Sequence, residues 1–446
     1  MDKYDVIVVG AGIAGLGVAG LLQKAGLQTL LLDKSKLPGG RAKTREVPGG
    51  WRIDSGIHAV DGGGNSACAE LLKRVGIEIK WSRAIEGNLL FDGTGWKSME
   101  QYFNMSDDDK KIFAAMESSF AKMPEAQIDE MDSVSLADYI KKNVASPKIA
   151  EYLQLTGMVQ STLTDAGEIS MGELIYIYRE DMKHRSAGNN LGNARMPIGG
   201  IGVMTGAQAD AFVKLGGTVK YGLPVVSVEL SKASFKVKTA DGEFNAPRVV
   251  MALPIWQMTG LVSDPSGMLP AGWLDGMKGL HDKTSCSMGF TMGLSKPLFD
   301  GPVYLSAWRV PGLGLPLQIL GHTNFDSTIA PPGHMIAFIG TPCTPTQARD
   351  PKFREANLAK FWDVLHVMFP GFEDTVVWKF DGFYVGIDGL ARSPGLTGKL
   401  RPPVSMAELP GLYFAGDCYT GRGVGMNAAS NSAMLCAEKI LADMRR

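Results

Sequence analysis

The sequence of 446 residues has few cysteines, no uninterrupted apolar run of about 18 residues and a formal net charge of only −1. The five cysteines lie far apart, without the spacing of a metal site or a disulfide framework, so no metal is expected. This cysteine usage favours a reducing compartment, and we expect a cytoplasmic protein. Without a long apolar run no transmembrane segment is expected, although peripheral contact with a membrane stays open. The near-zero charge removes the electrostatic argument for a nucleic-acid partner.

The composition is otherwise that of a globular protein, with 45% hydrophobic and 20% charged residues. No signal peptide is expected, because the first apolar run leads directly into a glycine-rich turn and has no cleavage site. There is no internal repeat and no low-complexity stretch. The length exceeds what one simple core holds and predicts two domains.

The first 33 residues predict a dinucleotide-binding unit. Residues 5–9 form a short β-branched run typical of a strand buried on both faces, and the glycine pattern of residues 10–15 opens a helix. In such a turn Gly10 allows the tight bend, Gly12 lets the backbone approach a pyrophosphate, and Gly15 lets helix and strand pack closely. A second apolar strand ends at Asp33, which is placed to accept hydrogen bonds from a ribose diol.

The next segment distinguishes FAD from NAD. Residues 37–44, Leu-Pro-Gly-Gly-Arg-Ala-Lys-Thr, resemble the Gly-Gly-Arg continuation of the flavoprotein superfamily of amine oxidases, protoporphyrinogen oxidases and phytoene desaturases. The resemblance implies that Arg41 and neighbouring amides hold the cofactor phosphates. An enzyme that binds NAD alone has no use for this segment.

Three later segments carry the same resemblance in the family order. They are Pro-Ile-Gly-Gly with the strands that follow it (residues 197–230), the apolar run 249–254, and Gly416-Asp417 with a helix over about 427–444. The family layout implies the following FAD-binding residues: Gly10, Gly12, Ala14, Gly15, Asp33, Lys34, Gly40, Arg41, Ser55, Gly56, Val226, Ala252, Gly416, Asp417, Gly425 and Met426.

These anchors predict an α/β fold, with a Rossmann-type FAD-binding domain (GR2-like) and an inserted α+β substrate domain. The FAD domain is expected to take residues 1–80, 195–262 and 395–446, and the substrate domain residues 81–194 and 263–394. In the first insert we expect helices over 107–123, 135–143 and 147–160. In the second we expect strands at 286–294, 335–339 and 375–380, and a helix over 354–368. We also expect residues 218–221 and 225–230 to form a strand pair.

The inserts should hold the chemistry. Methionines (99, 105, 288, 292) and aromatic residues (308, 378, 380, 383, 384) together fit an apolar cavity over the flavin, although core packing is the more common explanation for any single one of them. The family layout implies His58, Tyr384 and Lys399 as catalytic candidates, with Arg401 beside them. A lone histidine is more often structural than catalytic, and Lys399 and Arg401 could be surface charges.

The amine-oxidase reading is weakened by missing residues. The strand at 286–294 contains no lysine to approach flavin N5, the aromatic pair that frames an amine is hard to find, and the covalent-flavin cysteine motif is absent. We read Cys418 as a small buried residue and expect FAD to be held non-covalently.

The closest resemblance is to the phytoene-desaturase-like branch. It implies an FAD-dependent dehydrogenase or oxidase that acts on C–C or C–H bonds of a hydrophobic small molecule by hydride transfer to flavin N5. Two alternatives stay open: a flavin amine oxidase acting on a C–N bond, and a non-catalytic binding protein with the same fold. The substrate, the direction of reaction, the electron acceptor and the oligomeric state do not follow from the sequence.

Overall fold

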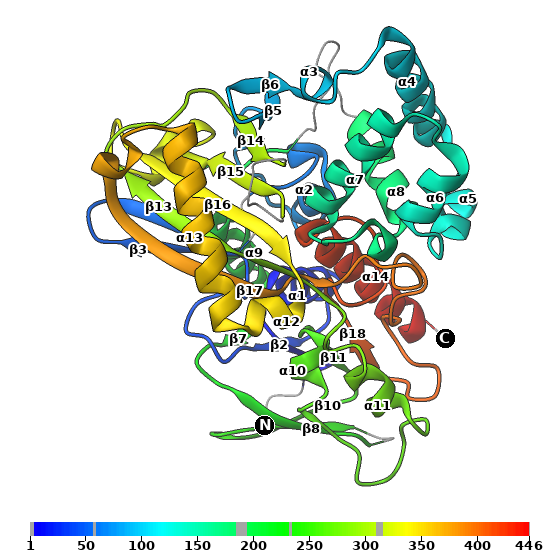
Figure 1. Cartoon of the computed structure of the whole chain (residues 1–446). Coiled ribbons are helices and arrows are strands. Elements are labelled where there is room, and N and C mark those ends of the chain that lie inside the picture. The colour runs from blue at the N-terminus through cyan, green and yellow to red at the C-terminus, as the bar shows by residue number, and fades with distance from the viewer. Residues whose placement is uncertain (1–3, 57–58, 184–193, 232–233, 309–314, 446) are drawn as a thin grey trace.

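The structure is a computed structural model that describes residues 4–56, 59–183, 194–231, 234–308 and 315–445. At its centre lies a parallel sheet of five strands in the order β18-β11-β1-β2-β7 (Figure 1). Its strands come from both ends and the middle of the chain: β1 Val6–Val9, β2 Thr29–Leu32, β7 Thr218–Lys220, β11 Val249–Met251 and β18 Leu412–Phe414. The two chain ends therefore meet in one layer.

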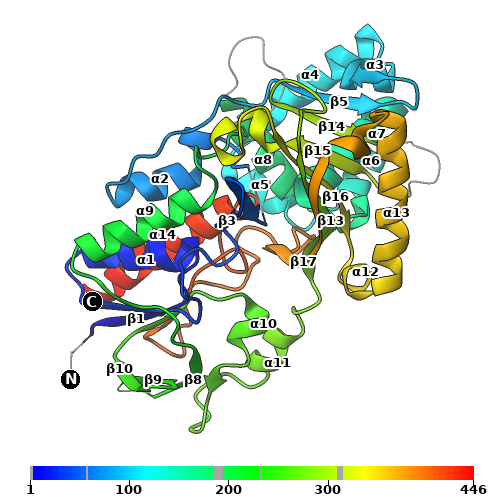
Figure 2. The same ribbon diagram turned by 90° about the vertical axis from the view of Figure 1, so that its left-hand side faces the viewer.

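Both faces of this sheet are covered, which explains why its strands are continuous apolar runs. Every residue of β1 and β2 is buried. One face is covered by a group of four helices, in which α2 packs on α14 and α1 (Figure 2). These are α1 Ile13–Lys24, α2 Ala67–Arg74, α9 Gly202–Lys214 and α14 Met426–Met444.

The other face packs against a smaller sheet, in the order β10-β9-β8-β12, and two short helices. Their bounds are β8 Val225–Glu229, β9 Phe235–Thr239, β10 Gly242–Ala246, β12 Val262–Ser263, α10 Ile255–Met258 and α11 Trp273–Lys278. The expected pairing of β7 with β8 is wrong, because β7 pairs with β2 whereas β8 pairs with β9 and β12. Between them the chain runs back over the end of β2, where Gly222 and Leu223 donate to the carbonyls of Ser35 and Asp33.

A second large sheet has seven strands in the order β17-β13-β16-β15-β14-β5-β6, antiparallel except for the pair β14–β5. Helices α12 and α13 lie against it (Figure 1), with α12 packed on β13 and β17 and α13 on β13. The bounds are β5 Gly87–Phe91, β6 Trp96–Ser98, β13 Thr284–Leu294, β14 Val303–Ala307, β15 Leu317–Gly321, β16 Met335–Cys343, β17 Val376–Leu390, α12 Pro345–Arg349 and α13 Pro351–Met368. A separate hairpin joins β3 Lys43–Val47 to β4 Trp51–Ser55.

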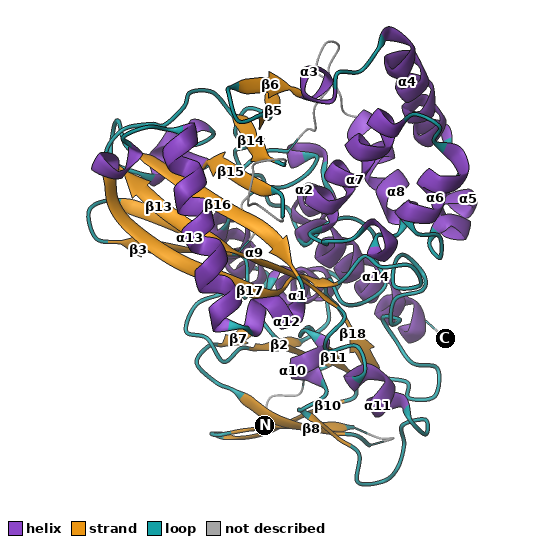
Figure 3. Cartoon of the chain, in the orientation of Figure 1, coloured by secondary structure: helices purple, strands orange, loops and turns teal. Residues whose placement is uncertain are grey.

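The remaining helices gather on one side of the molecule (Figure 3), where α3 packs against the edge strands β5 and β6 of the seven-stranded sheet. They are α3 Met99–Phe103, α4 Asp107–Lys122, α5 Glu125–Met131, α6 Leu136–Asn143, α7 Pro147–Ser161 and α8 Met171–Lys183, and we call them the helical insert. Four of them begin at a serine whose side chain caps the first turn: Ser98, Ser106, Ser135 and Ser146. The three helices expected from the sequence are confirmed as α4, α6 and α7, whereas α3, α5 and α8 were not predicted.

The expected α/β class is confirmed, and the structure shows it as a parallel Rossmann-like sheet with a separate mixed sheet. Over the described ranges, no helix is both long and apolar enough to cross a membrane.

Candidate functional site

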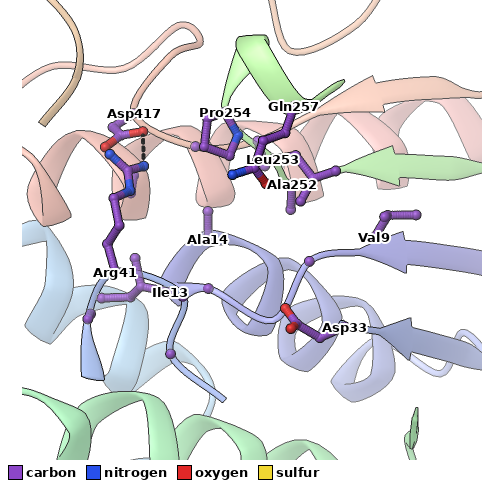
Figure 4. A pocket seen from close by; sticks show the side chains of 18 of the residues that line it. Val9, Ile13, Ala14, Asp33, Arg41, Ala252, Leu253, Pro254, Gln257 and Asp417 are labelled. Atoms are coloured by element: carbon purple, nitrogen blue, oxygen red, sulfur yellow. Dashed lines mark hydrogen bonds and ion pairs between the residues drawn. The ribbon is translucent and has the colours of Figure 1, made fainter. Parts of the chain in front are cut away.

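A cavity of about 660 Å³ lies at the carboxyl ends of β1 and β2, and we call it the cofactor cavity. Figure 4 shows its wall, to which residues 9–14, 32–35, 39–43, 252–257 and 415–429 contribute. Carboxyl ends of parallel strands are where open α/β sheets bind ligands. The volume falls within the range of about 300–1,000 Å³ typical of ligand pockets.

The three glycines of the turn allow close packing at Gly10 and Gly15 and leave open space at Gly12. Gly10 has φ +107°, and a Cβ there would lie 2.5 Å from the Ala252 carbonyl oxygen. At Gly15 a Cβ would lie 1.8 Å from the Gly10 carbonyl oxygen, so this glycine allows helix α1 to pack against the turn. At Gly12 a Cβ would meet nothing within 4 Å, because that direction opens into the cavity.

Asp33, at the end of β2, holds this turn in place. Its carboxylate accepts hydrogen bonds from the backbone N–H of Ala11 and of Ser35, both at 2.6 Å. Two helices begin at the wall, α1 after Gly12 and α14 after Gly425. Their free N–H groups and positive dipole ends suit the negative charge of a pyrophosphate or a reduced flavin.

Arg41 and Asp417 join the two ends of the chain across the cavity. The Arg41 Nη2 lies 2.7 Å from the Asp417 Oδ1, as the dashed line in Figure 4 marks. Arg41 also donates to the carbonyl oxygen of Gly386. A planar, permanently charged guanidinium with several donors suits a phosphate-binding wall.

The residues present fit FAD. The open direction at Gly12, the two helix N-termini and Arg41 would receive its pyrophosphate, and Asp33 its ribose. Twelve of the sixteen predicted contacts lie in the cavity wall: Gly10, Gly12, Ala14, Asp33, Lys34, Gly40, Arg41, Ala252, Gly416, Asp417, Gly425 and Met426.

The other four predicted contacts lie elsewhere. Gly15 packs against the turn, Ser55 ends β4 in the hairpin, and Gly56 lines a different cavity. Val226 is 56% exposed and outside the wall, whereas its neighbour Val225 lines it. The correction has a structural cause, since the pairing of β8 with β9 shifts register between Val225 and Ser227, and such a bulge re-aims side chains.

A second cavity of about 290 Å³ adjoins the first, and we call it the adjoining cavity. Ile387 on β17 lines both cavities, and Val424 of the adjoining cavity is followed directly by Gly425 of the cofactor cavity. The volume is close to the lower limit of ligand pockets, so it suits a compact molecule or one end of a longer one.

The wall of the adjoining cavity is amphipathic. Apolar side chains come from Ile85, Met99, Leu155, Val159, Leu320 and Phe338, and polar ones from Asn88, Thr156, Gln160, Tyr304, Ser306 and Gln318. Among the described residues, the buried side-chain oxygen of Gln160 has no hydrogen-bond partner. Such an orphaned acceptor costs about 1–3 kcal/mol unless a ligand or water satisfies it, so this wall suits a substrate with a hydrogen-bond donor.

Three carboxylates also line the adjoining cavity: Asp61, Asp181 and Asp388. Asp61 is an exposed residue, but desolvation by the surrounding protein and the neighbouring charge of Asp181 raise its carboxyl pKa to about 6. Asp388 is buried and accepts a hydrogen bond from the Thr162 hydroxyl at 2.8 Å. Asp61 can therefore exist in both protonation states near neutral pH, as a group that exchanges protons must.

The catalytic candidates from the sequence are not brought together. His58 lies outside the described residues. Tyr384, on β17, lines neither cavity. Lys399 has a side chain 76% exposed and forms an ion pair with Asp129 at 2.6 Å, so it is a surface residue. Arg401 is buried and donates to the carbonyl oxygens of residues 390, 396 and 417, which is a structural role.

The predicted lining by methionine and aromatic residues is largely wrong. Of those nine residues only Met99 lines the adjoining cavity. Met288 and Met292 are fully buried in the core between α13 and its sheet. Phe380 and Phe383 are about half exposed. Strand alternation explains the position of Met288, because its neighbour Ser287 faces the opposite side of the sheet and lines the adjoining cavity.

Amine-oxidase features are also missing from the described part of the site. No lysine lines the adjoining cavity. Trp378 packs edge-on against Trp51 with ring centroids 5.2 Å apart, and Tyr419 is buried and donates to the Leu253 carbonyl oxygen. Burial and the charge of Asp417 raise the pKa of the Cys418 thiol to about 12, which leaves it a poor nucleophile.

The sequence analysis missed Asp61 and Asp388. Asp61 follows His58 by three residues and carries a chemically similar signal, an isolated titratable side chain after β4. Asp388 lies in the glycine-rich segment 383–389, whose sequence pattern marks no catalytic side chain. Both are single carboxylates without a motif, and only the fold places them in one wall.

Similarity to known proteins extends over the whole chain. Prolycopene isomerase from Daucus carota is 24% identical over 518 aligned residues, covering 99% of this chain and 80% of that protein. Carotenoid 3,4-desaturase from Haloarcula japonica is 25% identical over 512 residues, covering 100% and 99%.

Solved structures share the fold. An oxidoreductase from Methanosarcina mazei superimposes with a TM-score of 0.79 at 20% identity, covering 99% of this chain and 100% of that chain. Cyclohexylamine oxidase from Brevibacterium oxydans gives a TM-score of 0.67 at 17% identity, with 100% of each chain covered. The model of the family described as flavin containing amine oxidoreductase matches residues 13–441. With this match and a cavity that fits FAD, the chain belongs to the flavin-containing amine oxidoreductase family and is an FAD-dependent enzyme.

Proposed function

We propose that this FAD-dependent oxidoreductase oxidises a C–C bond of a compact, mainly hydrophobic molecule that carries at least one hydrogen-bond donor. The observation that carries this proposal is the amphipathic adjoining cavity, which shares Ile387 with the cofactor cavity. Relatives named for carotenoid desaturation and prolycopene isomerisation support C–C chemistry. The volume of about 290 Å³ favours a smaller molecule than a whole carotenoid, or one end of it.

Each part of the cavity has a role in this reaction. When bound, FAD supplies the acceptor for a hydride. The apolar wall orients the substrate and keeps water away, which is the larger catalytic contribution, up to roughly 7–11 kcal/mol in favourable cases. The Gln160 oxygen accepts the hydrogen-bond donor of the substrate.

Formation of a C=C bond also releases a proton from the neighbouring carbon. The carboxylate of Asp61 is the group in the wall that accepts it, because its pKa of about 6 leaves it mostly ionised at neutral pH. A positioned general base contributes typically about 10²–10⁴-fold to the rate. Return to the oxidised enzyme requires an electron acceptor such as dioxygen or a quinone.

The test is anaerobic bleaching of the flavin absorbance in the purified holoprotein. We expect a cyclic or isoprenoid molecule with a hydroxyl or similar donor to bleach it, and the product to contain one additional C=C bond. Amines and porphyrinogens complete the panel. Bleaching by amines alone would overturn the proposal in favour of C–N oxidation, and isomerisation without bleaching would overturn the oxidative direction.

A further inference from the structure

The loop from Gly421 to Gly425 forms part of the wall between the two cavities. Val424 lines the adjoining cavity, whereas Gly425 and Met426 line the cofactor cavity. Helix α14 begins at Met426, so this loop also decides where the N-terminus of that helix lies.

Arg422 fastens this loop to the helical insert through four carboxylates. Its side chain is 9% exposed. It binds both oxygens of Asp132, at 3.0 and 2.9 Å, and single oxygens of Asp129 at 2.6 Å, Glu125 at 3.0 Å and Glu173 at 3.3 Å. These carboxylates come from α5, the residue that follows it, and the first turn of α8.

Glu173 also holds the backbone of the loop directly. Its Oε1 accepts a hydrogen bond from the Gly423 N–H at 2.6 Å, and its side chain is 3% exposed. On the other side the Gly423 carbonyl oxygen accepts a hydrogen bond from Arg392 at 3.3 Å. Asn431 on α14 donates to the Arg422 carbonyl oxygen at 2.8 Å. Side chains from three other parts of the chain therefore fix two successive peptide groups.

The charged cluster is better suited to orienting the loop than to stabilising the fold. Buried ion pairs rarely stabilise a fold more than well-packed apolar side chains would. Bidentate guanidinium–carboxylate pairs, however, define a direction as well as a distance. The cluster lies against the loop, although none of its charged side chains lines either cavity.

We propose that Arg422 and Glu173 are positioning residues that fix the backbone from Gly423 to Met426, so that the helical insert determines how tightly FAD is held. Neither residue reaches the cofactor cavity, so both act through the loop. The proposal needs no substrate, and its failure can therefore be distinguished from failure of the proposed reaction.

The test compares Glu173→Leu with Glu173→Gln in the holoprotein. The leucine variant loses the acceptor for the Gly423 N–H, whereas glutamine keeps a side-chain oxygen there. For Glu173→Leu we expect a rise of about tenfold or more in the FAD dissociation constant, the size typical of one lost charge-assisted hydrogen bond. Amide hydrogen exchange in residues 423–426 should accelerate by a similar factor. In Glu173→Gln both the FAD dissociation constant and the exchange rate should stay closer to the wild-type values.

A matched control removes a charge elsewhere. Arg349→Met breaks an exposed ion pair with Asp282 and should change neither value. Arg422→Lys keeps the positive charge but loses the planar guanidinium, and it serves as the test if Glu173→Leu does not fold. For Arg422→Lys we expect weaker FAD binding and faster amide exchange in residues 423–426. If either folded variant is merely less stable, while FAD affinity and exchange in residues 423–426 stay within about twofold of wild type, the proposal is wrong.

Discussion

The cofactor cavity is built on a backbone motif, a glycine turn with two helix N-termini, whereas the adjoining cavity has no such motif and is defined by side chains. In the first, glycines and two helix N-termini lie beside charged side chains such as Asp33 and Arg41, and apolar side chains complete the wall. In the second, residues from the helical insert and the seven-stranded sheet project polar and apolar groups into a smaller volume. A backbone site recognises one constant ligand, and a side-chain site can change its substrate through single substitutions.

The largest effect should come from blocking the backbone site. Gly12→Val places a branched side chain in the space where the Cβ direction is open, so we expect loss of bound FAD with the fold retained. Flavin absorbance per protein and circular dichroism measure this. Gly206→Val is the matched control, because a Cβ there also meets nothing within 4 Å but Gly206 lies outside the cavity. Full flavin content in Gly12→Val would contradict the assignment of this turn.

The next effect concerns a side chain of the adjoining cavity. Asp61→Asn removes the proposed proton acceptor, so flavin reduction by a substrate should slow by about 10²–10⁴-fold. The wild-type rate should rise with pH through an inflection near pH 6, the raised pKa of Asp61, and the variant should lack this inflection. Stopped-flow absorbance at several pH values tests both points. An unchanged inflection would assign it to another group.

A smaller effect is expected at Asp54, on the stability of the fold rather than on catalysis. Burial and the charge of Asp326 raise the pKa of Asp54 to about 6 from 3.8. The protonated form therefore stabilises the fold fully below pH 3.8, and this contribution is lost as pH rises through about 6. Asp54→Asn should keep the hydrogen bonds from Thr44 and Ile201 and be more stable than wild type at pH 8, by up to about 3 kcal/mol. Denaturant unfolding of variant and wild type at pH 4 and pH 8 measures this difference in stability. An equal difference at both pH values would contradict the prediction.

The smallest effect is expected at Lys399. Its ion pair with Asp129 is on the surface, where such pairs contribute little. Lys399→Met should change flavin content and the rate of flavin reduction by less than about twofold. A large loss of rate with intact flavin would return this lysine to the catalytic candidates.

The same contrast explains how far the sequence could be read. The glycine turn, Asp33 and Arg41 occur in a fixed local pattern, so the residues of the cofactor cavity could be named in advance. The adjoining cavity has no such pattern, because Asp61, Gln160 and Asp388 come from three unrelated elements. Met288 and Phe383 show that residue type alone does not predict a cavity wall, since the same type is equally suited to a core or a surface. The prediction of Val226 is one residue away from Val225, which lines the cavity, because nothing in a β-branched run marks the bulge in β8.

The most direct test of this account is to fill the adjoining cavity without touching the cofactor cavity. Val159, on α7, lines only the adjoining cavity, and Val213, on α9, is 52% exposed. With a substrate that bleaches wild type, Val159→Trp should keep its FAD and lose bleaching, and the matched Val213→Trp should keep both. Bleaching at the wild-type rate by a Val159→Trp protein that holds its FAD would show that the substrate binds elsewhere.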